Sequence, residues 1–138
     1  MRFLFFILLL LQLATIHAEE LSEEYQQGWF AFQAKDYGKA ADIWKKLADK
    51  GDTKAALGLA AIYENGLGTA RNPAESARWY QVAADQGSPE AQHDLGIKYF
   101  TGNGVKKDQD KAFSLWKKAA EKGLGVAQAK TGYMYHQG

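Results

Sequence analysis

The chain repeats itself every 36 residues, and this period restricts the possible folds more than any other feature of the sequence. Each repeated position keeps one kind of side chain, usually glycine, alanine or an aromatic. The columns are Gly51, Gly87 and Gly123; Trp44, Tyr80 and Trp116; Ala48, Ala84 and Ala120; Ala55, Ala91 and Ala127; Tyr63, Tyr99 and Tyr135; Gly66, Gly102 and Gly138. A unit of this length buries its apolar face only by stacking on its neighbours. The sequence therefore predicts a linear array of stacked units.

Each unit has the pattern of two helices. In one unit, Ala91, Leu95 and Tyr99 lie four residues apart and define one apolar helical face. A second helical pattern centres on Trp116, and a glycine-rich stretch at residues 102–104 separates the two. The predicted fold class is all-α: an α/α superhelix (solenoid) of antiparallel helix pairs, with about seven helices after an N-terminal leader.

The ends of the helices are also marked in the sequence. Asn72 suits an N-cap, Pro73 the first turn, and Glu75 the acidic position of a capping box. Asp108 is placed to cap the corresponding helix one unit later. Gly87 follows the second helix of its unit, where a left-handed residue commonly ends a helix.

Two columns of small residues predict close helix packing. One contains Ala60, Gly96 and Gly132, and the other contains Ala40, Ser76 and Ala112. If the two columns face each other, the helices of one unit can approach closely, and the aromatic columns fill the space between units.

These residues resemble a known family. The motif is Ala91-x3-Leu95-Gly96-x2-Tyr99-x2-Gly102-x-Gly104-Val105-x2-Asp108-x2-Lys111-Ala112-x3-Trp116-x2-Ala119-Ala120-x2-Gly123. It is similar to a Sel1-like repeat of the tetratricopeptide-like superfamily. The resemblance implies an α/α superhelix that binds proteins or peptides, commonly as an adaptor in bacterial envelopes or secretory-pathway complexes.

The first helix pair departs from this motif. Eight residues separate Gly28 from Asp36, whereas twelve separate Gly96 from Asp108, so the long glycine loop is missing. This shorter form is more similar to a tetratricopeptide unit. The predicted organisation is a signal peptide (1–18), a tetratricopeptide-like pair (19–52), two Sel1-like repeats (53–88 and 89–124) and the first helix of a further repeat (125–138).

The first eighteen residues differ from the rest. Arg2 precedes an apolar run over residues 3–11, and a small residue, Ala18, stands before acidic Glu19. This pattern is typical of a cleaved secretory signal peptide and is short for a membrane span. We expect a protein secreted through this leader, periplasmic or extracellular, with no membrane association after cleavage. An uncleaved anchor is the alternative.

The composition argues against several kinds of site. The chain has no cysteine and a formal net charge of +1, so it offers no thiolate ligand and no basic face for nucleic acid. His93 and His136 lack the spacing of a zinc site. The glycine pairs lack the third glycine and the preceding strand of a dinucleotide loop. We expect no metal, no cofactor and no nucleic-acid partner.

One short stretch of the sequence matches a catalytic motif. Ser114 and Lys117 have the Ser-x-x-Lys spacing of penicillin-recognising enzymes. The companion Ser-Asp-Asn and Lys-Thr-Gly elements are absent, and both positions vary freely between units. We therefore expect no enzyme activity, with hydrolysis of β-lactam or cell-wall substrates as the alternative.

The first helix of each pair is the predicted binding surface. Counting from the small-residue column gives inward positions rich in aromatic side chains, which are typical of peptide grooves. The candidate peptide-binding residues are Tyr25, Trp29, Phe32, Leu57, His93, Ile97, Phe100 and Tyr133. The alternative, that several of these aromatics are interior packing, stays open.

The leading hypothesis is a non-catalytic scaffold that binds a protein or peptide on its concave face. An inhibitory or immunity-type protein that shields one partner is a further alternative. Because Gly138 falls on the column of Gly102, we expect the last unit to have only its first helix. The sequence is then either a fragment of a longer array or a short protein that forms an end-to-end homodimer.

Overall fold

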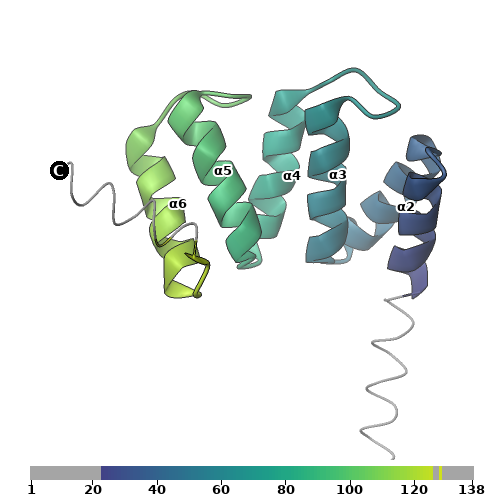
Figure 1. Ribbon diagram of the computed structural model, residues 1–138, viewed down its shortest axis with the longest axis horizontal. Helices are drawn as coiled ribbons and strands as arrows, with labels where there is room; N and C mark the ends of the chain where they lie inside the picture. Colours follow the sequence, from purple (N-terminus) through teal and green to yellow (C-terminus); the bar gives the residue numbers. More distant parts are fainter. Residues whose placement is uncertain (1–22, 126–127, 129–138) are drawn as a thin grey trace, which may run out of the picture.

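The computed structural model describes residues 23–125 and 128, and this part of the chain is helical throughout, with no strand. A helix over residues 23–33 is followed by α2 (Tyr37–Asp49), α3 (Thr53–Asn65), α4 (Pro73–Asp85), α5 (Pro89–Thr101) and α6 (Gln109–Glu121). Figure 1 shows successive helices packed side by side in one row. The predicted all-α solenoid is confirmed. The seventh expected helix falls at 125–138, almost all of which lies outside the described residues.

Each of the five labelled helices begins at a polar cap. Asn72 accepts a hydrogen bond from the Glu75 backbone N–H, and Asp108 accepts one from Lys111, as the sequence predicts. Asp36, Asp52 and Ser88 cap the other three in the same way. The Glu75 carboxylate binds Arg78 (3.0 Å), so it does not complete the predicted capping box.

The connections within pairs come in two lengths. Residues 66–72 join α3 to α4 and 102–108 join α5 to α6, whereas residues 34–36 join the first helix to α2. Gly66 and Gly102 end α3 and α5 in the left-handed conformation, with φ of 62° and 74°. In the short turn Lys35 takes this conformation, with φ of 61°. The missing glycine loop is therefore a real difference in the backbone.

The glycine column packs against the tryptophan column. A Cβ added at Gly28 would lie 2.6 Å from Cδ1 of Trp44, and one added at Gly96 would lie 2.6 Å from Cδ1 of Trp116. The indole N–H groups then donate to backbone carbonyls of the first helices, those of Tyr25 (3.4 Å) and His93 (3.1 Å). The close approach is as predicted, and the atoms nearest to each of these glycines belong to the indole.

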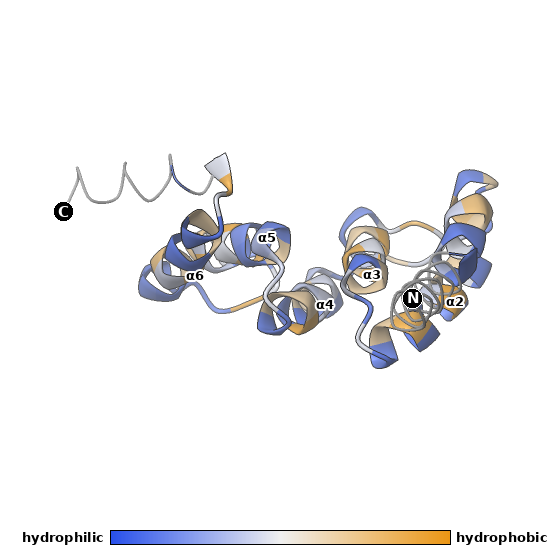
Figure 2. Ribbon diagram, turned by 90° about the horizontal axis from the view of Figure 1, so that it is seen from below, coloured by the Kyte–Doolittle hydropathy of each residue, from blue (hydrophilic) through white to orange (hydrophobic). Residues whose placement is uncertain are grey.

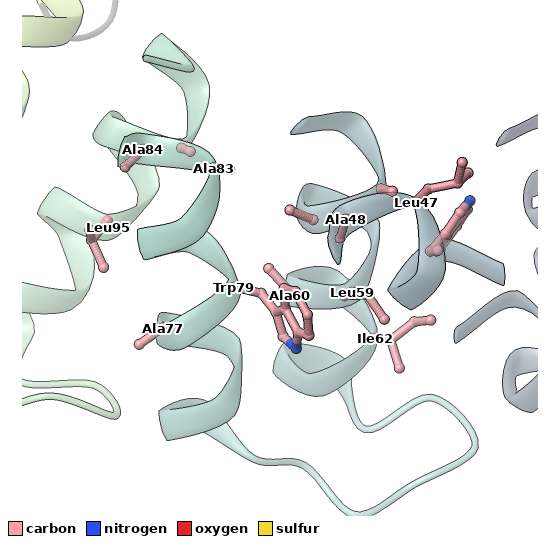
Figure 3. Packing of buried hydrophobic residues seen from close by; sticks show 14 of the residues in the cluster. Leu47, Ala48, Leu59, Ala60, Ile62, Ala77, Trp79, Ala83, Ala84 and Leu95 are labelled. Carbon is pink, nitrogen blue, oxygen red and sulfur yellow. The ribbon is translucent and has the colours of Figure 1, made fainter. Parts of the chain in front are cut away.

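The core runs along the whole array as a continuous layer of small and aliphatic side chains. Figure 3 shows Trp79 reaching from α4 toward Leu59 and Ala60 of α3, with Ala77 and Leu95 between α4 and α5. Figure 2 shows apolar residues facing the neighbouring helices and polar residues outside, and the helices alternate between two rows. Helices α3 and α5 lie in one row and α4 and α6 in the other. The predicted binding positions belong to the first of these rows.

Candidate functional site

A cavity of about 250 Å³ opens between α3, α4 and α5. It lies where two neighbouring units meet on the row that contains the predicted binding positions. Its lining residues are Glu64, Tyr80, Asp94, Ile97, Lys98 and Asn103. Of the eight predicted binding residues, Ile97 alone lines this cavity.

A buried ion pair forms the wall of this cavity and joins the two units. Lys98 is only 4% exposed, and its ammonium donates to the carboxylate of Glu64. The Asn103 amide donates to the same carboxylate (3.0 Å), and the Lys98 Nζ lies 5.7 Å from the centre of the Tyr80 ring. Arg71 also reaches Glu64, at 3.4 Å. Glu64 therefore holds side chains from α5, the 102–108 loop and the 66–72 loop.

The surroundings shift two pKa values at this site. Burial acts to raise the pKa of Glu64, but the hydrogen bond and charge of Lys98, with the bond from Asn103, outweigh it and lower the pKa from its usual 4.5. Burial, with the negative charges of Asp94 and Glu64, raises the pKa of Tyr80 to about 12. At neutral pH the carboxylate is ionised and the phenol is protonated.

The aromatic residues at the start of the array surround Trp44. Tyr25 stacks on its indole with ring centres 5.8 Å apart, and Phe32 lies 5.5 Å from it. Trp29 stacks on Phe32 (5.6 Å) and is 43% exposed. Tyr25 and Phe32 thus serve partly as packing around Trp44, while Trp29 presents an accessible aromatic surface.

The equivalent arrangement recurs around Trp116. Phe100 packs on its indole (5.5 Å) and is 36% exposed, and the carbonyl of His93 accepts the indole N–H. The His93 ring contacts Asp94, with 2.9 Å between Nδ1 and Oδ1. Leu57 is half-buried against the core. The eighth predicted residue, Tyr133, lies outside the described residues.

Sequence reasoning did not predict Lys98, Tyr80 or Asn103 as site residues. Lys98 stands in the column of Ile62, which is buried. A cation therefore occupies a position that belongs to the apolar core in the preceding unit. Glu64 stands in the column of Phe100. In each of these two columns, one unit has an apolar residue and the neighbouring unit has a charged one. The two charges are opposite, and this was the signal that could have found the pair.

The structure does not bring Ser114 and Lys117 together into a site. Both lie on exposed parts of α6, and Ser114 lines a groove between α4 and α6 that does not include Lys117. Among residues 23–125 and 128, no three histidine or carboxylate side chains are grouped as metal ligands. No helix in that part of the chain is long and apolar enough to cross a membrane.

Comparisons with known proteins agree with this architecture. The Sel1 repeat family model matches residues 18–52, 53–88, 89–124 and 125–138. A Sel1 repeat protein from Oxalobacter formigenes is 31% identical, with a TM-score of 0.73 over 79% of this chain and 45% of its own. The protein c5321, a protective antigen in uropathogenic Escherichia coli strains with an SLR fold, is 33% identical, with a TM-score of 0.78 over 88% of this chain and 27% of its own.

A more distant structure supports the fold alone. Helicobacter pylori cysteine rich protein B (hcpB) is 20% identical, with a TM-score of 0.66 over 80% of this chain and 93% of its own. The chain matches less than half the length of each of the two more similar structures. A search of curated proteins found no match.

Proposed function

Because the chain belongs to the Sel1 repeat family, whose members generally mediate protein–protein interactions, we propose that it is a non-catalytic scaffold that binds an extended or helical peptide segment of a partner protein. The binding surface is the row formed by the first helices of the units. Rigid display of this surface is the mechanism, with no chemistry and no cofactor.

One observation carries this proposal. The large apolar side chains exposed in the described part of the chain are Trp29, Phe30 and Phe100, and all three come from first helices of their pairs. Trp29 and Phe100 rest on aromatic residues of the interior, which hold their rings in place. Exposed aromatics on a rigid support are typical centres of binding energy because little side-chain entropy is lost on binding.

The test uses a peptide selected on the purified protein from a random displayed library. Replacing Trp29 and Phe100 together with alanine is expected to raise the dissociation constant by about tenfold or more, because both side chains supply apolar contact area. Affinity is measured by titration calorimetry, and circular dichroism checks that each variant is folded.

Phe30→Ala is the matched control. Phe30 is 65% exposed on the same helix as Trp29, but among the described residues no aromatic ring packs against it, whereas Phe32 supports Trp29. Unchanged affinity in the Phe30 variant, with loss in the double variant, supports Trp29 and Phe100 as the centres of binding on the row of first helices. If Phe30→Ala lowered the affinity and the double variant did not, binding would lie at the end of the array, which would contradict the proposal.

We also propose that the protein works outside the cytoplasm, in the periplasm or beyond. The support is the leader pattern at residues 1–18. Expression of the full chain in a bacterial host is expected to give a product that begins at Glu19, as read by mass spectrometry of the osmotic-shock fraction. An intact N-terminus in the cytoplasmic fraction would contradict this.

A further inference from the structure

A second and larger cavity, of about 440 Å³, lies on the opposite row, between α4 and α6. It belongs to a different face from the proposed peptide surface. Its lining residues are Gln81, Ala84, Asp85, Gly87, Gln92, Lys111, Ser114, Leu115, Lys118 and Lys122. The volume is in the range of small-ligand sites.

The net charge of the residues that line this cavity is positive. Lys111, Lys118 and Lys122 line it, and none of them has a carboxylate within ion-pair distance among the described residues. Lys122 donates to the carbonyl of Gly87, and Lys111 lies over the Tyr99 ring, contacts that leave both charges in place. Cations that converge on a concave surface attract anions more strongly than scattered ones.

The single carboxylate in the lining, Asp85, can offset only one of these three charges. Asp85 already accepts a hydrogen bond from the Gln81 amide, at 2.7 Å. Three lysines therefore stand against one aspartate, and that aspartate is engaged on the α4 side.

At two corresponding positions one unit earlier the side chains are larger. Thirty-six residues before Leu115 stands Trp79, which is 4% exposed. Thirty-six residues before Ser114 stands Arg78, whose guanidinium lies 4.6 Å from the centre of the Trp79 ring. Serine and leucine thus stand at the cavity where the preceding unit has arginine and tryptophan.

The charges also change between the two grooves. Glu75 and Arg78 neutralise each other in the earlier one, at 3.0 Å. The corresponding position of Glu75 is Lys111, and that of Val82 is Lys118. An acidic and an apolar position have therefore both become basic at this cavity.

An unsatisfied polar group stands at the wall of this cavity. Gln92 is 4% exposed, and its Oε1 has no hydrogen-bond partner in the described part of the chain. Its Nε2 makes only a long bond, 3.4 Å, to the carbonyl of Ala84. A buried acceptor of this kind is stabilised by a ligand that brings an N–H donor.

We propose that this cavity binds the C-terminal carboxylate of a peptide. The carboxylate lies between Lys111 and Lys118, with the Ser114 hydroxyl as a further donor. The last amide N–H of the peptide donates to the free oxygen of Gln92, and Leu115 contacts the terminal side chain. The site requires a negative charge for the lysines and an N–H donor for Gln92. A peptide carboxylate with its adjacent N–H supplies both, whereas a bare anion supplies only the charge.

The test uses the full chain and N-acetyl-alanyl-alanine as the probe, with titration followed by NMR amide shifts. Lys118→Val, which restores the residue found at position 82, is expected to raise the dissociation constant by about tenfold. Leu115→Trp, which copies Trp79, is expected to abolish binding by filling the space. Lys117→Val is the matched control, since Lys117 lies on the same helix outside the cavity, and it should leave binding unchanged.

Two further probes separate the proposed ligand from a simple anion. The same dipeptide with a C-terminal amide should bind at least tenfold more weakly, because it lacks the charge. Inorganic phosphate should also bind more weakly, because it has no amide N–H. Equal binding of the amide or of phosphate, or unchanged binding in folded Lys118→Val and Leu115→Trp variants, overturns the proposal.

Discussion

Gly96→Ala is expected to lower the free energy of unfolding by about 1–3 kcal/mol, the usual cost of overfilling a packed interior. The new methyl group would lie 2.6 Å from Cδ1 of Trp116, and that indole is held by its hydrogen bond to the carbonyl of His93. The ring cannot move without losing this bond. Urea unfolding followed by circular dichroism measures the change.

The chain itself supplies the compensating substitution. In the middle unit the glycine position holds Ala60, and the tryptophan position holds Tyr80. Adding Trp116→Tyr to Gly96→Ala should therefore recover part of the loss, with a coupling energy of about 1 kcal/mol in a double-mutant cycle. Purely additive effects would show that the two residues do not share one space.

Gly38→Ala is the matched control for the glycine effect. Gly38 lies in α2 with no atom within 4 Å of an added Cβ. There the same change should stabilise the protein by about 0.5–1 kcal/mol, because alanine favours the helix and loses less backbone entropy on folding. A loss of stability at both glycines would mean that backbone conformation, and not contact with the indole, causes the effect.

Glu64→Phe is expected to cost about 3 kcal/mol, at the lower end of the range for breaking a buried ion pair, because the Glu64 side chain is 26% exposed. Phenylalanine is the residue at the corresponding position 100, so the helix tolerates it. The loss arises because Lys98 stays buried without its carboxylate. Thermal and urea unfolding measure it.

Replacing both partners should remove most of this loss. Lys98→Ile restores the residue of position 62, and the double variant is expected to unfold within about 1 kcal/mol of the unchanged protein. Glu75→Gln is a control, since the Glu75–Arg78 pair is solvent-exposed and worth less than about 1 kcal/mol. If the double variant were as unstable as Glu64→Phe alone, the charge of Lys98 would not be the cause.

The pH dependence gives a second measurement of the same pair. Because folding lowers the pKa of Glu64 below its usual 4.5, its contribution to stability is present above that pH and is lost as the pH falls through the folded value. Between pH 7 and pH 3, the unchanged protein should therefore lose more stability than the double variant.

The fold was predictable because its determinants lie in columns of one kind of residue. Glycine, alanine and aromatic positions at one spacing indicated the helix pairs, and polar residues such as Asn72 and Asp108 marked where helices begin. These are local signals, repeated in each unit. The six described helices follow from them.

The details of the sites were less predictable, because they depend on exceptions to the columns. Lys98 and Glu64 lie 34 residues apart, two short of the period, so column comparison does not pair them. The aromatic stripe gave Trp29 and Phe100 as accessible residues, but it could not separate them from Tyr25, which stacks on Trp44. Sequence spacing gives the face of a helix but not the depth of each side chain.

The two kinds of contact act at different levels of the array. The indole bonds of Trp44 and Trp116 join the two helices of one pair, whereas the Glu64–Lys98 pair joins one unit to the next. A stacked array unfolds in a single sharp step only while the coupling between neighbours is strong compared with the stability of each unit. Part of that coupling here depends on an ionised carboxylate. We therefore expect protonation of Glu64 at low pH to shorten the stretch of chain that unfolds together, while the indole bonds within each pair remain.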